Sequence, residues 1–328
     1  MSRRLKLRLL SGLFVLLVVG GAAVWLFGPR EEVDATVRFD PASIGRDPQA
    51  YLAAEEAEVQ GITAETTKEI VWAYPASRAK TPLAIVYIHG YSADKRELRP
   101  VPDQVAEALG ANLFYTRLTG HGSDLAALAE PTANDWLNDV AEAIAIGRQI
   151  GERVIVMSTS TGGTLTAWAA SLGLTEGVDA FVMVSPNFRL ADWRAPLLTM
   201  PFARAIVPLV YPSRQLELVK PAPDGSRTAD FPTIALLPMA ALVEAVRGLN
   251  FAAITTTTLF VYSQQDQVVD PAATASVIER WGGPKEVLLA PETEDPLGHM
   301  LAGDLFSPST TDAVAGAITT WVEGLAGG

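Results

Sequence analysis

The feature that most constrains the fold is a β-branched run that enters a turn of small residues and continues as a helical pattern. The run spans residues 154–157, the turn spans residues 158–163, and the helical pattern follows over residues 164–170. A strand, a sharp turn and a helix in this order lift the side chain at the apex clear of the backbone. Ser160 stands at that apex and is the first candidate for a catalytic nucleophile.

The turn departs at one position from the pattern G-x-S-x-G that surrounds a nucleophilic serine in such turns. Ser158 stands where the first glycine is expected. The position needs a small side chain, so we expect serine to fit there with slight crowding. A tight turn between a strand and a helix is also rich in Ser, Thr and Gly for conformational reasons alone, so Ser160 needs partners elsewhere in the chain.

Composition indicates a folded chain with an acidic body. The 328 residues are 49% hydrophobic and 19% charged, which fits one large domain or two smaller ones rather than disorder. The absence of cysteine excludes disulfides and thiolate metal sites. Residues 31–328 hold 20 Lys and Arg against 37 Asp and Glu, a formal charge of about −17 that argues against a nucleic-acid partner.

The first thirty residues differ from this body. Four basic residues between Arg3 and Arg8 precede an uncharged run over residues 9–27. Nineteen helical residues reach roughly 28 Å, close to a hydrocarbon core of about 30 Å. We expect residues 1–30 to form an uncleaved transmembrane anchor with its basic flank in the cytoplasm and the body outside it. The alternative is a signal peptide cut near residues 20–23, which would leave the body secreted or periplasmic.

The remaining chain divides into a short lead and one large domain. Residues 31–67 are mostly polar and predict a linker with a surface helix over residues 48–59. Strand patterns then alternate with helical patterns from residue 68 to residue 328, which predicts an α/β fold with a mostly parallel sheet. The alternation stops over residues 187–254, where eight prolines and short helical patterns indicate an inserted, mainly helical cap. The predicted strands are 68–74, 83–88, 112–116, 154–157, 180–184, 255–262 and 285–289, and the longer helices are 101–109, 134–150, 240–249 and 311–325.

A catalytic serine needs a base and an acid, and both are found after later strands. His299 lies between the last predicted strand and the last helix, so its loop can return the imidazole to the edge where Ser160 points. Asp266 follows the strand over residues 255–262 and is our candidate for the carboxylate that orients this imidazole. Asp270 and Asp295 are weaker candidates, because Asp270 precedes a proline in a helix-start pattern and Asp295 precedes a proline in a turn.

Two backbone N–H groups are the candidate oxyanion donors. His89-Gly90-Tyr91 follows the strand over residues 83–88 directly, a position from which the Tyr91 N–H can reach a tetrahedral intermediate. The second donor is the N–H of Thr161, just after the serine. We expect His89 itself to brace its loop rather than to act as a base.

These landmarks together resemble the α/β-hydrolase superfamily. The ordered set is His89-Gly90-Tyr91-Ser92, Arg117 to Gly122, the Ser160 turn, Asp266 and Gly298-His299. Thr119-Gly120-His121-Gly122 is similar to the PGHG loop of monoacylglycerol lipases and lysophospholipase-like serine esterases, with threonine in place of proline. The resemblance runs from residue 68 to the C-terminus and implies the α/β-hydrolase fold, with His121 in a structural loop near the site.

The sequence therefore predicts a serine hydrolase that cleaves carboxylic esters through Ser160, Asp266 and His299, with no cofactor and no metal. The anchor and the apolar cap residues suggest a lipid ester with an apolar acyl group, although those cap residues fit an ordinary core equally well. They are Leu197, Leu198, Phe202, Ile206 and Val207. The alternatives are an acyltransferase or amidase that uses the same three residues, and a non-catalytic, membrane-tethered binding protein. The oligomeric state stays open.

Overall fold

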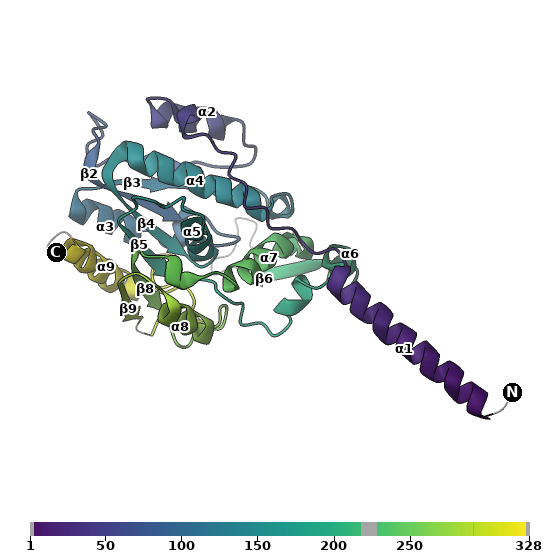
Figure 1. Ribbon diagram of the computed structural model, residues 1–328. Helices are drawn as coiled ribbons and strands as arrows, with labels where there is room; N and C mark the ends of the chain where they lie inside the picture. Colours follow the sequence, from purple (N-terminus) through teal and green to yellow (C-terminus); the bar gives the residue numbers. More distant parts are fainter. Residues whose placement is uncertain (1–2, 218–227, 291, 326–328) are drawn as a thin grey trace.

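A sheet of seven strands forms the centre of the computed structural model, which describes residues 3–217, 228–290 and 292–325 (Figure 1). The strand order is β1-β3-β2-β4-β5-β8-β9, and each neighbouring pair is parallel except β1 with β3. This confirms the predicted α/β fold. The strands are β1 (Glu69–Val71), β2 (Thr81–Ile88), β3 (Asn112–Tyr115), β4 (Gly151–Thr159), β5 (Ala180–Val184), β8 (Thr257–Tyr262) and β9 (Lys285–Leu289).

Helices cover both faces of the sheet, which explains why its inner strands are apolar on both sides. In β2, Ile85 and Tyr87 pack with α3 (Val101–Leu109) and α9 (Thr311–Leu325). Val86 and Ile88 point to the other face and pack against α4 (Ala133–Ile150). The helices α5 (Thr161–Ser171) and α8 (Pro271–Arg280) belong to that second layer (Figure 1).

The parallel strands end level with one another, and this gathers the loops that follow them at one edge. Ile88 of β2 lies opposite Ser158 of β4, and Thr159 lies opposite Val184 of β5. Tyr262 at the end of β8 lies opposite Leu289 of β9. The carboxyl ends of parallel strands are where α/β folds form their sites, so the predicted site residues converge there.

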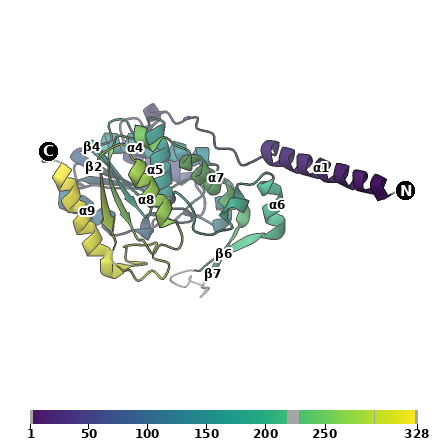
Figure 2. The same cartoon turned by 60° about the horizontal axis from the view of Figure 1, so that its bottom comes forward.

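The segment between β5 and β8 lies beyond this edge of the sheet, and it is not wholly helical (Figure 1). It contains an antiparallel pair of strands, β6 and β7, which the sequence analysis missed (Figure 2). The two strands pair only with each other, β6 is mostly polar, and in β7 only Ala229 and Phe231 alternate with polar residues, which is too short a pattern to indicate a strand. The helix predicted over residues 240–249 begins earlier and spans residues 236–247. The elements are η4 (Ala195–Leu198), α6 (Ala203–Val210), β6 (Ser213–Glu217), β7 (Thr228–Pro232), η5 (Thr233–Ala235), α7 (Leu236–Arg247) and η6 (Phe251–Ala253).

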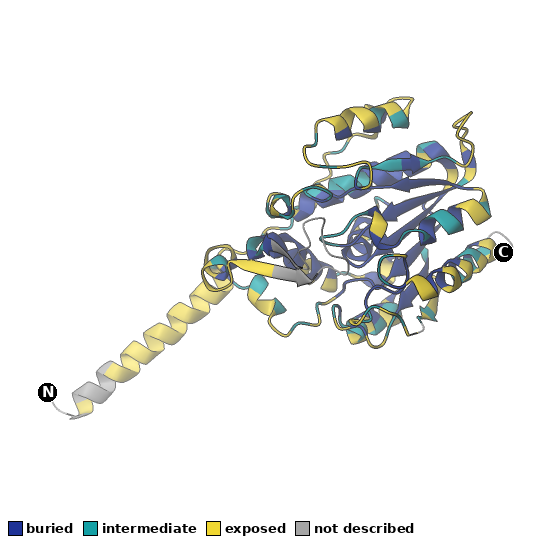
Figure 3. Cartoon of the chain, turned by 180° about the vertical axis from the view of Figure 1, so that it is seen from behind, coloured by how far each residue is buried: buried dark blue, intermediate teal, exposed yellow. Residues whose placement is uncertain are grey.

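The N-terminal helix α1 (Arg3–Phe27) stands away from the body (Figures 1 and 3). Its stretch from Leu10 to Phe27 has a mean hydropathy of 2.3 and none of it is buried. This helix is long and apolar enough to cross a membrane, a property that membrane anchors and signal sequences share.

The lead that follows α1 is packed onto the body. In α2 (Pro48–Ala57), Leu52 is a fully buried member of the core beside α4, and Asp47 caps the helix as its position before Pro48 indicates. The remaining short helices are η1 (Pro41–Ile44), η2 (Lys95–Glu97), η3 (Leu125–Ala129) and η7 (Pro308–Thr310).

Candidate active site

Ser160 occupies a strained turn between β4 and α5. Its φ of 51° and ψ of −116° lie in a region that serine rarely adopts. Hydrogen bonds fix the backbone on both sides of this turn. The Ser160 N–H donates to Val184 O at 2.9 Å, and Ser160 O accepts from Asn187 N at 3.0 Å and from Gly163 N at 2.9 Å. Such strain persists only where the surroundings enforce it, and here the end of β5 provides that support.

The glycine that this turn requires comes after the serine. A Cβ on Gly162 would lie 2.2 Å from Ile88 O, so only glycine lets α5 begin against the end of β2. Ser158, in contrast, fits the position where the usual pattern has glycine. It is fully buried, and its Oγ lies 3.5 Å from Val182 O.

His299 and Asp266 form a buried pair at the same edge of the sheet. His299 Nδ1 lies 2.7 Å from Asp266 Oδ2, and the two side chains are 9% and 1% exposed. Asp266 Oδ1 accepts the N–H groups of Val268 and Val269 at 2.8 and 2.9 Å. Both oxygens of the Asp266 carboxylate are thus held by the fold, and the imidazole keeps Nε2 for another partner.

The two alternative aspartates have other partners. Asp270 caps α8 by accepting from Ala272 N at 2.9 Å, and it forms an ion pair with Arg189. Asp295 Oδ2 accepts the backbone N–H groups of His299 and Met300 at 2.8 and 2.7 Å. Asp295 therefore holds the loop that carries the histidine, a role that the sequence analysis did not foresee.

The end of β5 contacts the backbone of both Ser160 and His299. The Ser160 N–H is bonded to Val184, and the next residue, Ser185, donates from Oγ to His299 O at 2.7 Å. Among the described residues, no hydrogen bond joins Ser160 Oγ to the imidazole. The serine, the imidazole and the carboxylate nevertheless flank the carboxyl ends of adjacent strands β4, β5 and β8.

The two predicted oxyanion donors lie beside the serine. Thr161 opens α5, and the turn after β2 approaches Ser160 so closely that a Cβ on Gly90 would lie 3.2 Å from Ser160 Cβ. Within the described part of the chain, neither the Tyr91 N–H nor the Thr161 N–H donates to a protein acceptor.

A buried glutamate supports the same turn, and the sequence analysis missed it. Glu97 Oε1 accepts from Gly90 N at 2.6 Å and from Tyr87 Oη at 2.8 Å, and Tyr87 Oη also lies 2.9 Å from Thr159 Oγ1. Burial raises the pKa of Glu97 to about 8, so this carboxyl is largely protonated at neutral pH. The residues before Glu97 in the sequence are charged, a pattern that is typical of a solvent-exposed segment and does not predict burial.

The other two histidines are structural. His89 Nε2 accepts from Leu118 N at 3.0 Å and its Nδ1 lies 2.8 Å from Gly90 O, which confirms the predicted bracing. Burial lowers the pKa of His89 to about 4 and that of His121 to about 3, so both rings are neutral. The His121 ring packs 5.1 Å from His89 and 5.5 Å from Tyr91 between ring centroids.

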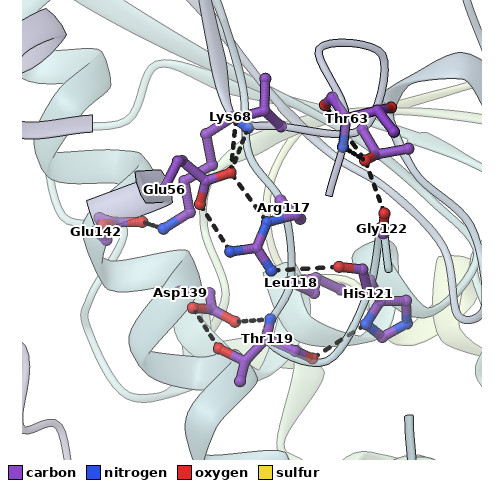
Figure 4. A network of polar contacts seen from close by, with 12 residues as sticks. Glu56, Thr63, Lys68, Arg117, Leu118, Thr119, His121, Gly122, Asp139 and Glu142 are labelled. Carbon is purple, nitrogen blue, oxygen red and sulfur yellow. Dashed lines mark hydrogen bonds and ion pairs between the residues drawn. The ribbon is translucent and has the colours of Figure 1, made fainter. Parts of the chain in front are cut away.

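An ion pair and several hydrogen bonds fasten the His121 loop to the lead and to α4 (Figure 4). Arg117 forms two hydrogen bonds with Glu56 of α2, at 3.0 and 2.7 Å, and donates to His121 O at 3.3 Å. Arg117 and Glu56 are both buried. In α4, Asp139 accepts from the backbone and the hydroxyl of Thr119.

The apolar cap residues do not form a common core. Of the five, only Val207 is buried, while Leu197, Phe202 and Ile206 are each more than 40% exposed. A cavity of about 430 Å³ lies between residues 189–199, α7 and the start of α8, and neither Ser160 nor His299 lines it.

The chain is similar in sequence to known hydrolases. The model of the Alpha/beta hydrolase family matches residues 85–317, more than half of the chain. A thermostable monoacylglycerol lipase from Bacillus sp. (strain H-257) is 30% identical over 89 residues. That match covers 27% of this chain and 35% of the relative, so the chain spans about a third of the length of the curated relative that it matches.

Solved structures share the fold at low sequence identity. A structure of the metagenome-derived lipolytic enzymes LipS and LipT is 19% identical with a TM-score of 0.61, and the match covers 80% of this chain and 99% of that one. A soluble variant of monoglyceride lipase from Saccharomyces cerevisiae is 12% identical with a TM-score of 0.61, over 79% of this chain and 91% of that one. The profile match, together with this shared fold, shows that the chain belongs to the Alpha/beta hydrolase family.

Proposed function

We propose that the protein is a serine hydrolase that cleaves carboxylic esters through an acyl-enzyme on Ser160. The observation that carries this proposal is the 2.7 Å contact between His299 Nδ1 and Asp266 Oδ2 beside a serine with a φ of 51°. A carboxylate in this position keeps the proton on Nδ1 and stabilises the imidazolium that forms during the reaction.

The chemistry requires only groups of this chain and water. Ser160 Oγ forms a bond to the ester carbonyl carbon as its proton moves to His299 Nε2, and the N–H groups of Tyr91 and Thr161 donate to the oxyanion. The ester C–O bond then breaks, and the alcohol leaves with the proton from Nε2. Water attacks the acyl-enzyme and gives a proton to Nε2, which returns it to Ser160 Oγ as the carboxylic acid leaves.

We propose a lipid ester with an apolar acyl group as the substrate, of the monoacylglycerol or lysophospholipid type. The Bacillus relative is named as a monoacylglycerol lipase and the yeast structure as a monoglyceride lipase, and both names support this class. We further propose that residues 1–30 are an uncleaved membrane anchor and that the body lies on the extracytoplasmic side. Residues 68–328 then form the hydrolase domain with a cap at 187–254, and residues 31–67 form a lead that packs onto this domain rather than the expected linker with a surface helix.

A serine-directed fluorophosphonate probe tests the nucleophile. We expect the wild type and Ser158→Ala to be labelled and Ser160→Ala to be unlabelled. Ser158 is the matched control, because it lies two residues away and is fully buried. Equal labelling of the wild type and Ser160→Ala would remove the assignment and favour a binding protein on a hydrolase scaffold.

Substrate screening tests the rest of the proposal. p-Nitrophenyl esters of graded chain length, monoacylglycerols and lysophospholipids should all lose turnover in Ser160→Ala. Product analysis with an added acceptor alcohol or amine separates hydrolysis from acyl transfer. Release of the free acid in the presence of the acceptor supports hydrolysis, and a transferred acyl group as the main product contradicts it.

A further inference from the structure

The cap helix α6 exposes an apolar face to its surroundings. Phe202, Ile206 and Leu209 are 41%, 41% and 85% exposed, and Val210 and Tyr211 are 62% and 50% exposed. Spacings of four, seven and eight residues place the first four side chains on one side of a helix. We call this set, residues 202, 206 and 209–211, the α6 face. It is apolar where a helix in contact with water carries polar side chains.

The opposite side of α6 is a normal packed surface. Ala203 and Val207 are buried against Leu237 of α7. The helix is therefore apolar on both sides, and only one side is covered by protein. Its single charged residue, Arg204, is engaged by Glu31 in a two-point ion pair.

The same end of α6 is joined to the end of α1. The Phe202 N–H donates to Pro29 O at 2.7 Å. Gly28 packs so closely that a Cβ there would lie 2.7 Å from Pro201 Cβ and 2.9 Å from Phe202 Cε2. Figures 1 and 2 both show α1 leaving the body beside α6. We call these contacts, between residues 28–31 and residues 201–204, the joint.

The joint fixes the depth of the α6 face relative to the helix that would cross the bilayer. Phe27 is the last residue of the apolar span, and Pro29 follows only two residues later. An atom that hydrogen-bonds Pro29 therefore lies at the level where the anchor leaves the hydrocarbon. Trp25 and Tyr211 are also of the aromatic type that is enriched at this level.

We propose that the α6 face rests in the interfacial layer of the bilayer that α1 crosses, and that the joint holds the cap in this position. This proposal rests on the proposed anchor and does not require the ester chemistry. Contacts within the cap also connect α6 to the turn after β2. The buried side of α6 packs with Ile234 of η5, and the next residue, Ala235, accepts from the hydroxyl of Tyr91 at 2.7 Å.

Site-specific fluorescence on the full-length chain tests the position of the α6 face. The chain has no cysteine, so one introduced cysteine carries a single environment-sensitive label. We choose Leu209→Cys on the α6 face, Phe27→Cys at the end of α1, and Val287→Cys on β9 as an exposed apolar control at 46% exposure. Each labelled chain is reconstituted in phosphatidylcholine vesicles with and without nitroxide-labelled phosphatidylcholine.

We expect the nitroxide lipid to quench the labels at positions 27 and 209 and to leave the label at position 287 unquenched. Quenching at position 27 without quenching at position 209 would overturn the proposal and leave the anchor intact. An unquenched label at position 27 would instead contradict the membrane anchor, and this proposal with it. Neither readout depends on hydrolysis, so a failure of the ester chemistry is recognised separately by the fluorophosphonate probe.

The joint is tested by reversing its ion pair. Arg204→Glu places two carboxylates together, and we expect it to reduce quenching at position 209 while position 27 stays quenched. The double variant Glu31→Arg with Arg204→Glu restores opposite charges and should restore the quenching. Unchanged quenching in Arg204→Glu would refute the role of the joint, and the zwitterionic lipid excludes an effect of vesicle charge.

Discussion

The buried carboxyl of Glu97 should make the stability of this protein fall as the pH rises. Glu97 retains its proton in the folded chain up to about pH 8, whereas its ordinary pKa is 4.5. Between these values the folded chain binds one more proton than the unfolded chain, and linkage then requires the free energy of unfolding to decrease with pH. Glu97→Gln replaces the protonated carboxyl with a neutral group of similar shape and removes this proton.

The magnitude follows from the width of that window. One proton changes the free energy of unfolding by about 1.4 kcal/mol per pH unit. From pH 4.5 to about pH 8 the wild type loses on the order of 5 kcal/mol relative to Glu97→Gln. Below and above this pH range, the difference in the free energy of unfolding between the wild type and Glu97→Gln should not change with pH.

Urea unfolding of the full-length chain in a non-ionic detergent, from about pH 5 to about pH 9, measures this difference. Glu107→Gln is the matched control, because Glu107 is an exposed glutamate on α3. The free energy of unfolding of Glu107→Gln should change with pH in the same way as that of the wild type. If the free energy of unfolding of Glu97→Gln also changes with pH as the wild type does, the Glu97 carboxyl is ionised in the folded chain and the reasoning fails.

Three further substitutions test the site. Asp266→Asn should lower kcat by about 10³- to 10⁴-fold, because the amide favours the wrong imidazole tautomer, while Asp270→Asn should keep kcat near the wild-type value in the same ester assay. Asp295→Ala should lower kcat by about 10²-fold with little change in KM, since the loop of His299 loses its anchor, and equal kcat values would contradict this role. Gly162→Ala should reduce the free energy of unfolding by about 3 kcal/mol or more, because its Cβ meets Ile88 O. Gly316→Ala, with open space around it on a helix, serves as the control in the same urea titration.

The parts of the fold that follow from local patterns were predictable from the sequence. The strand over residues 285–289 and the helix over residues 311–325 have the predicted bounds. The meeting of Asp266 and His299 was also predictable, since both follow strands whose ends share one edge of a parallel sheet. At the open edge of the sheet the prediction was weaker, and β1 covers only residues 69–71 of the expected 68–74.

The parts that depend on packing between distant segments were not predictable. Three consecutive charged residues, Lys95-Arg96-Glu97, predict a solvent-exposed segment. In the structure, however, Lys95 and Glu97 are only 2% and 6% exposed. Lys95 is buried because Glu69 of β1 reaches its Nζ at 2.6 Å, a contact between residues far apart in sequence. The β6–β7 pair was missed because both strands are short, although Phe231 of β7 packs into the core.

The contact of Arg117 with Glu56 sets a limit on how far the chain can be shortened for soluble expression. A chain beginning at residue 68, where the strand pattern starts, would lack Glu56, the carboxylate that pairs with Arg117. Ile44 and Leu52 would leave the core as well. A soluble version freed of α1 therefore has to retain η1 and α2, and its first residue belongs before Asp40, which caps η1.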